Sequence, residues 1–128
     1  MFENLDVFRM SSAMAIHAGQ RQAVVAQNVA NADTPGYKAR DIPEFKASYE
    51  PGDTGLVQRA SRNRHLHGGM DASPALSPFE TRDEASPDGN TVSVETEMAR
   101  GVEAKRQHDR ALAIYKSALT VLRTTIGK

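Results

Sequence analysis

The sequence predicts an all-α protein in which two long helices, one at each end of the chain, pack as an antiparallel coiled coil. An irregular or partly β segment is expected between them. Three observations lead to this fold class. All six prolines lie between Pro35 and Pro87, so long helices fit only toward the ends. Both ends carry apolar residues at steps of three and four, and a strong turn signal follows the first helix.

Composition limits both the core and the kind of partner. Hydrophobic residues make up 39% of the 128-residue chain and aromatic residues 5%, which is little material for a compact interior. The 16 basic residues balance the 16 acidic ones, which removes the electrostatic case for nucleic acid or an anionic membrane as a partner. The absence of cysteine excludes a disulfide scaffold, a thiolate metal site and a cysteine nucleophile. There is no apolar run near the ~18 residues of a membrane span, and no cleaved secretory signal is predicted.

The first helix is expected from about position 5 to position 31. This stretch contains no proline and a single glycine, and its apolar side chains recur at helical spacing. At 1.5 Å per residue it would be roughly 40 Å long, which is too long and too thinly apolar for an ordinary core helix. Its apolar stripe consists of Val7, Met10, Met14, Ala18, Val25 and Val29, widened by Leu5 and Phe8 near the start.

The stretch NVANADTPGY, residues 28–37, predicts the end of this helix and a chain reversal. Pro35 disfavours a helical conformation for Thr34, so the helix must end before that residue. The asparagines can satisfy terminal carbonyl groups or adopt a left-handed conformation. The last four residues fit a type II turn with proline and glycine at its centre, which would direct the tyrosine back toward the helix. The predicted turn motif consists of Asn28, Asn31, Thr34, Pro35, Gly36 and Tyr37.

Residues 38–90 form a predicted middle segment, between a first segment at 1–37 and a last segment at 91–128. Five of the six prolines fall here, and the apolar residues are isolated. Short strands are expected around KASYE (46–50) and GLVQRA (55–60). A segment of this composition cannot offset its own ordering entropy, so we expect it to be loose or to fold only against neighbours.

The last helix is expected to begin after Ser93, whose hydroxyl can cap an orphan backbone N–H. Glu95 and Glu97 then fall in the first turns, where the helix dipole favours negative charge. The apolar positions follow steps of three and four that are close to a heptad repeat. The predicted seam of this helix is Met98, Val102, Leu112, Tyr115, Leu119, Leu122 and Ile126, with Lys105 and His108 as a polar patch in its middle.

Few side chains suggest a ligand site. His65 and His67 are one residue apart in a loop with no clear third ligand, so we favour a solvated or interface loop over a metal site. The arginine-rich stretch 59–67 has no interleaved aromatic residue, so an inter-subunit contact or plain solubility is favoured over nucleic-acid binding. Met10 and Met14 indicate adaptable packing rather than a ligand set.

His17 and His108 lie on or beside the two stripes, where they could act as a pH-sensitive switch; we favour tolerated polar residues of the seam. Lys105 and Asp109 are spaced for an intrahelical ion pair. Carboxylates are otherwise scattered, and neither glycine-rich nucleotide motif is present. The sequence therefore predicts no catalytic residue, no cofactor, no metal and no small-molecule substrate.

Three stretches together resemble a known family. NVANADTPGYKARDI (28–42) resembles the N-terminal motif of bacterial flagellar axial proteins, the rod, hook and hook-associated subunits, and is most similar to that of the proximal-rod members. DGNTVSVETEM (88–98) is similar to the family's second motif, and KSALTVL (116–122) to its terminal-helix pattern. The resemblance covers both ends of the chain and the middle only weakly.

The resemblance implies a structural subunit of the basal-body rod rather than an enzyme. It implies terminal helices that pair as a coiled coil and stack helically into a tube through the periplasm. Export through the flagellar type III apparatus without a cleaved signal is also implied. The expected partners are copies of the chain, other rod subunits, basal-body ring or adaptor proteins and the export apparatus. Two long amphipathic ends with little core between them fit this expectation, because their apolar surface must find partners.

Two alternatives stay open at this point. The chain can be a free two-helix module that docks one soluble partner, which a stable monomer with a complex of finite size would support. It can also occupy another position in the rod, but the sequence ADTPGYKARD (32–41) argues against this.

Overall fold

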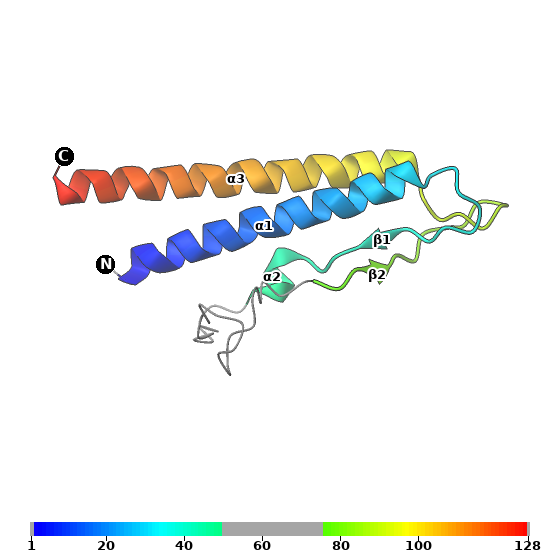
Figure 1. Ribbon diagram of the computed structural model, residues 1–128, viewed down its shortest axis with the longest axis horizontal. Coiled ribbons are helices and arrows are strands. Elements are labelled where there is room, and N and C mark those ends of the chain that lie inside the picture. Colours follow the sequence, from blue (N-terminus) through cyan, green and yellow to red (C-terminus); the bar gives the residue numbers. More distant parts are fainter. Residues whose placement is uncertain (1, 50–75, 128) are drawn as a thin grey trace, which may run out of the picture. The chain divides into compact units, whose positions relative to one another are not determined.

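The computed structural model describes residues 2–49 and 76–127. Two long antiparallel helices lie side by side along most of their length, which confirms the predicted fold class (Figure 1). One compact unit contains both long helices and a short strand pair, and a second unit contains a single-turn helix. Neither long helix, over its described residues, is apolar enough to cross a membrane. The elements are α1 (Phe2–Ala30), β1 (Arg40–Asp41), α2 (Phe45–Ser48), β2 (Phe79–Glu80) and α3 (Val94–Ile126).

The end of α1 follows the predicted turn chemistry. The Asn31 side chain donates to the carbonyl of Gln27 at 2.8 Å and so satisfies one of the last carbonyl groups of the helix. The backbone N–H of Tyr37 donates to the carbonyl of Thr34 at 3.2 Å, and Gly36 has a φ of +72°. A hydrogen bond from the fourth residue to the first and a positive φ at the third are features of a type II turn.

The start of α3 matches the capping prediction. Ser93 has an extended backbone, and its hydroxyl accepts a hydrogen bond from the N–H of Thr96, which confirms it as the N-cap. Glu95 and Glu97 lie in the first turn, where the helix dipole favours them. At the other end Gly127 adopts a left-handed conformation and returns its N–H to the carbonyl of Arg123.

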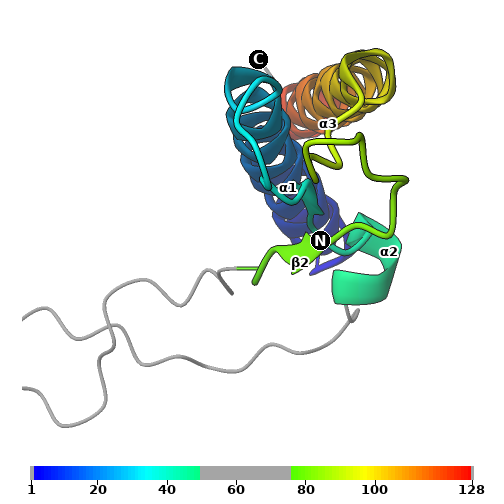
Figure 2. The same ribbon diagram turned by 90° about the vertical axis from the view of Figure 1, so that its right-hand side faces the viewer.

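A short antiparallel strand pair lies beside α1; the sequence predicted a partly β middle segment but not strands at these positions (Figure 1). Arg40 pairs with Glu80 and Asp41 with Phe79, and β1 packs against α1 (Figure 2). The ladder continues through backbone hydrogen bonds between segments distant in sequence. The N–H groups of Thr81, Gly36 and Thr91 donate to the carbonyl groups of Ala39, Asp88 and Tyr37, respectively.

The predicted strand around KASYE is wrong, because its first three residues, 46–48, belong to the helical turn α2. Two local interactions favour the turn over an extended strand. The Ser48 hydroxyl donates to the carbonyl of Glu44 at 2.9 Å, and the rings of Phe45 and Tyr49 stack with their centroids 5.1 Å apart. A strand here would place these two rings out of each other's reach. The second predicted strand, GLVQRA, lies outside the described residues.

The two long helices approach each other through small residues. Ala18 and Ala104 are fully buried, Ala111 is almost so, and the side chain of Val25 lies opposite Gly101. A methyl group built at Gly101 would lie 3.6 Å from Val25 Cγ1. Close packing therefore depends on side chains that let the backbones come near each other, rather than on large apolar ones.

The seam of α3 is offset by one residue from the predicted stripe. The buried residues are Glu97, Ala104 and Ala111, whereas Met98 and Leu112 lie one position further along and stay exposed. One position turns a side chain by about 100° around the helix axis. The expectation favoured the larger apolar side chains, while the close approach of the helices selects the smaller ones.

The other predicted seam residues divide between contact and solvent. Val25 is buried; Val7, Met10, Met14, Leu119 and Leu122 are half-buried; Val29, Val102, Tyr115 and Ile126 are exposed. Tyr115 nevertheless meets Phe8 edge to face, with ring centroids 5.1 Å apart. This contact lies toward the end of the pair where α1 begins and α3 ends, which we call the open end. The division of the chain at positions 37 and 90 stays a prediction.

Gly36→Ala is expected to destabilise the helix pair by about 1–2 kcal/mol, because its φ of +72° is unfavourable for a residue with a Cβ. No atom lies within 4 Å of the added methyl group, so the loss would come from the backbone alone. The matched control is Gly19→Ala, which also meets no neighbour but lies within α1 and should raise stability by about 1 kcal/mol. Urea unfolding followed by circular dichroism measures both; a stabilising Gly36→Ala would contradict the assignment of the turn.

Candidate functional site: a buried polar cluster and an exposed apolar strip

Asn28 lies at the centre of a polar cluster where α1, β1 and α3 meet. Its side chain is fully buried and uses its whole hydrogen-bonding capacity. The amide nitrogen donates to the carbonyl of Arg40 at 2.7 Å and to Glu97 Oε2 at 3.0 Å. The amide oxygen accepts from the N–H of Arg40 at 3.1 Å and from the Tyr37 hydroxyl at 3.3 Å. Asn28 therefore pairs with β1 as a neighbouring strand would, while it also reaches α3.

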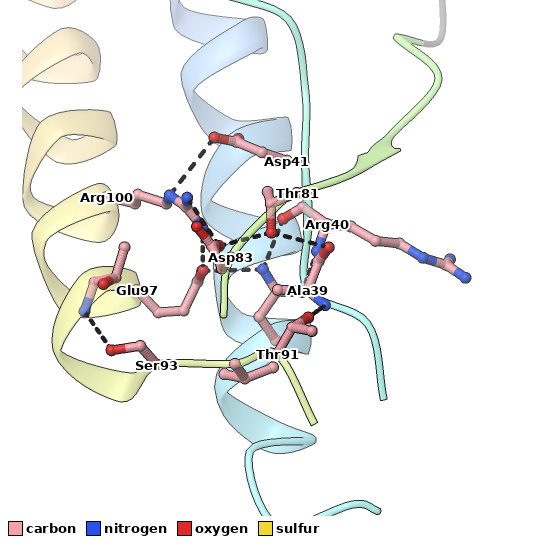
Figure 3. Close-up of polar contacts among 12 residues, drawn as sticks. Ala39, Arg40, Asp41, Thr81, Asp83, Thr91, Ser93, Glu97 and Arg100 are labelled. Atoms are coloured by element: carbon pink, nitrogen blue, oxygen red, sulfur yellow. Dashed lines mark hydrogen bonds and ion pairs between the residues drawn. The ribbon is translucent and has the colours of Figure 1, made fainter. Parts of the chain in front are cut away.

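Glu97 brings a negative charge into the helix interface, with only 1% of its surface exposed. Its second oxygen, Oε1, accepts from Arg100 Nη1 at 2.6 Å, one turn further along α3. The other terminal nitrogen of Arg100 donates to Asp83 Oδ2 at 3.2 Å, and Asp83 in turn accepts from the Thr81 hydroxyl at 2.7 Å (Figure 3). One arginine thus joins α3 to the segment that follows β2.

A second arginine joins α1 to β1. Arg21 donates from Nε to Asp41 Oδ1 at 3.2 Å and from Nη2 to Asp41 Oδ2 at 3.1 Å, a bidentate geometry that fixes both groups. Its remaining nitrogen lies 3.5 Å from Glu103 on α3. Asp41 also lies 3.9 Å from Arg100 Nε, so the two arginines share it. We refer to Arg21, Asn28, Asp41, Asp83, Glu97 and Arg100 as the polar cluster.

The charged side chains of the polar cluster find their partners within the fold. Burial lowers the pKa of Arg100, but the hydrogen bond and charge of Glu97 and the charge of Asp83 outweigh it, so the pKa is raised above its usual value. The described part of the chain contains no buried side-chain nitrogen or oxygen without a hydrogen-bond partner. A fully paired buried network holds its segments in one arrangement, because moving any segment strands a polar group away from water.

Asn90 links the two helices at the end of the pair where α1 ends and α3 begins, which we call the closed end. Sequence reasoning missed this residue. It is 2% exposed, and its amide nitrogen lies 2.8–3.0 Å from the carbonyl oxygens of Asn31, Ala32 and Thr34. Its amide oxygen accepts from the N–H of Val92, just ahead of α3. Asn90 therefore satisfies carbonyl groups that follow α1 from a position near the start of α3.

The predicted turn residues take different places at this end. Asn28 and Tyr37 meet each other, and Asn31 and Thr34 also contact each other, at 3.3 Å between Thr34 Oγ1 and Asn31 Oδ1. Pro35 and Gly36 lie exposed at the tip of the turn. Sequence reasoning had assigned Asn28 to the helix end, whereas the structure gives it a role between helices. Two partners of Asn28, Arg40 and Glu97, lie 12 and 69 residues away, so no local pattern marks them.

An apolar strip runs along the outside of α3, away from the seam. Val94 is 45% exposed, Met98 66%, Val102 51% and Leu112 40%. They are separated by four, four and ten residues, and at about 100° per residue these spacings place the side chains on one face of the helix. The exposed pair of Lys105 and Asp109, 2.9 Å apart, interrupts the strip. We call Val94, Met98, Val102 and Leu112 the apolar strip.

The remaining candidate residues carry no ligand chemistry among the described residues. His17 is buried in the seam, with Nδ1 at 3.1 Å from Gln107 Nε2, and His108 is half-buried beside Asp109. The hydrogen bond from Lys105 lowers the pKa of Asp109. The described ranges hold no group of three or more possible metal ligands. His65, His67 and the stretch 59–67 lie outside these ranges.

The arrangement suits assembly rather than chemistry on a substrate. The buried charged groups are paired with one another inside the fold, where they hold four segments together. The apolar strip is a line of exposed apolar side chains that have no partner within the described fold. The geometry therefore points to a rigid helix pair that offers a surface to another protein.

Comparison with known proteins agrees with this reading. Residues 11–38 match the model of a family described as flagella basal body rod protein. The chain is 32% identical to the flagellar basal body rod protein FlgB of Salmonella typhimurium over 127 residues, which covers 93% of this chain and 92% of that protein. It is 36% identical to FlgB of Yersinia enterocolitica over 80% of this chain and 75% of that protein. It is 29% identical to FlgB of Agrobacterium fabrum over 97% and 95% of the two chains.

Proposed function

Because this chain belongs to the flagellar basal body rod protein family, as a structural subunit of the proximal rod and not an enzyme, we propose that it assembles through the apolar strip of α3. Membership in a rod family implies assembly with other flagellar components. In our proposal these are copies of the chain and other rod subunits, together with ring or adaptor proteins of the basal body and the export apparatus. No nucleic acid or small molecule takes part.

The observation that carries the proposal is the exposure of the apolar strip on a helix whose seam with α1 is formed by other residues. The seam between α1 and α3 uses small residues and leaves Met98 and Val102 more than half exposed. Covering such a side chain contributes about 1 kcal/mol for the half that remains in water. The strip then contributes about 4 kcal/mol, which is comparable only to the lower range of the entropy lost on association. One contact of this kind is weak, so a stable rod needs several contacts per subunit.

The form of the assembly follows from the asymmetry of the surface. The strip lies on α3 alone, and in our proposal a neighbour covers it with a different part of its own surface, since two strips facing each other would close a dimer. Repeated contacts between unlike surfaces extend into a helical filament when the rotation does not close a ring. The half-buried and exposed seam residues near the open end, among them Leu119, Leu122 and Ile126, offer further apolar surface for such contacts.

The direct test of the proposed function is deletion of this chain from its bacterium. Cells without it are expected to be non-motile, and their isolated basal bodies should lack a rod by electron microscopy. The complete chain supplied in trans should restore both. Basal bodies with a normal rod in the deletion strain would contradict the proposal.

The alternative of a two-helix module that docks a single partner makes a different prediction. Such a module would give a complex of fixed mass whatever the concentration. A rod subunit mixed with other rod subunits should give particles that grow with concentration. Light scattering of the purified chain, with and without candidate rod subunits, distinguishes the two.

A further inference from the structure

The contacts between α1 and α3 show that the two helices face each other in one definite alignment. Asn28 meets Glu97, His17 meets Gln107 and Phe8 meets Tyr115. Between the first two of these contacts, Arg21 meets Glu103. As the residue number falls along α1 it rises by nearly the same amount along α3, as expected for an antiparallel pair without gaps.

The small buried residues of the seam do not by themselves specify this alignment. They recur seven apart, Ser11 with Ala18 and Val25 on one helix, Ala104 with Ala111 on the other. Sliding one helix by a heptad in one direction would place Ala18 opposite Gly101, which again puts a small residue opposite a small one. Only side chains with a unique partner can distinguish the native alignment from a shifted one.

We infer that Asn28, Asn90 and Glu97 form a register clasp: they determine which residues of α1 face which residues of α3. All three are at least 98% buried, and each joins the α1 side of the closed end to the α3 side. A shift of one heptad would leave the Glu97 carboxylate without the Asn28 amide. It would also remove Asn90 from the three carbonyl groups that it serves. A buried polar group in a helical seam sets register in this way because every other alignment leaves it unsatisfied.

The register matters for assembly if the proposed function holds. A shift of one heptad moves α3 by about 10 Å along α1, at 1.5 Å per residue. The apolar strip would move by the same distance relative to α1 and to the turn at its end. The clasp would therefore fix where one subunit presents its contact surface to the next. The register itself can be measured without any assembly.

The absence of natural cysteine allows a direct measurement of register by disulfide formation. Val25→Cys with Gly101→Cys reports the native alignment, because these two positions already face each other. Ala18→Cys with Gly101→Cys reports a shift of one heptad in one direction, and Val25→Cys with His108→Cys a shift in the other. In the otherwise native chain only the first pair is expected to oxidise readily.

The clasp is then removed with Asn90→Ala and Glu97→Ala together. We expect the disulfide of at least one shifted pair to increase by about tenfold, because Asn90 and Glu97 no longer oppose the shift. The conservative Glu97→Gln alone keeps an acceptor for Asn28 and should retain the native pattern. The matched control, Lys105→Ala with Asp109→Ala, removes an exposed polar pair from the same helix and should also retain it.

Two results would overturn the inference. The first is a clasp variant that keeps its helical circular dichroism and still forms only the native disulfide, because the seam would then define register by itself. The second is loss of helical signal in the clasp variant and in both of its single substitutions. In that case the three residues would hold the fold together rather than select one alignment. Neither result depends on whether the chain builds a rod.

Discussion

Replacing Arg100 with methionine is expected to lower the free energy of unfolding of the helix pair by about 3 kcal/mol. Arg100 is the partner of Glu97 Oε1 and of Asp83, and methionine would leave the Glu97 carboxylate buried without a counter-charge. Breaking a buried ion pair from one side costs about 3–5 kcal/mol. We place Arg100 at the lower end because 18% of its side chain remains in contact with solvent. Urea unfolding of the complete chain, followed by circular dichroism, measures the loss.

The control and a double variant make this result specific. Lys105→Met removes a cation from the same helix, but its pair with Asp109 is exposed, so no measurable loss of stability is expected. Glu97→Leu combined with Arg100→Met removes both charges together and should recover at least part of the loss, because no unpaired buried charge remains. Equal losses in the free energy of unfolding for Arg100→Met and Lys105→Met would show that burial of the polar cluster does not increase its contribution to stability.

Placing two negative charges on the apolar strip, with Met98→Glu and Val102→Glu, is expected to abolish motility while the isolated chain stays folded. Both side chains are exposed in the subunit, so its stability should change by less than about 0.5 kcal/mol for each substitution. In the assembled rod both charges would be buried against a neighbour and would lose their hydration. Swimming in soft agar measures motility, and electron microscopy of basal bodies shows whether a rod is present.

The matched control places the same charge on the same helix outside the strip. Arg106→Glu together with Arg110→Glu changes two exposed residues of α3 and should leave the apolar strip able to bind. This control also changes net charge more than the strip variant does. If net charge alone impaired motility, the control would therefore lose motility at least as strongly as the strip variant. Normal swimming of the strip variant, at normal cellular amounts of the chain, would rule out the strip as an assembly contact.

Local sequence determined where the helices begin and end. The turn after α1 follows from Pro35 and Gly36, whose backbone preferences do not depend on the rest of the fold. The start of α3 follows from Ser93 and the acidic residues behind it. The distribution of proline between the two ends then predicted two long helices, and the fold class with them. These features are readable because their interactions lie within a few residues of each other.

The tertiary structure decided which residues meet. By sequence alone Glu97 is an ordinary residue of the first turn of a helix, and only its partners, Asn28 and Arg100, make it part of the polar cluster. Asn90 lies in a stretch that signals a turn, yet it serves carbonyl groups 56 to 59 residues away. The seam was displaced by one residue for the same reason. Hydrophobicity ranks side chains one at a time, whereas the distance between two helices depends on the smallest pairs that both of them can bring together.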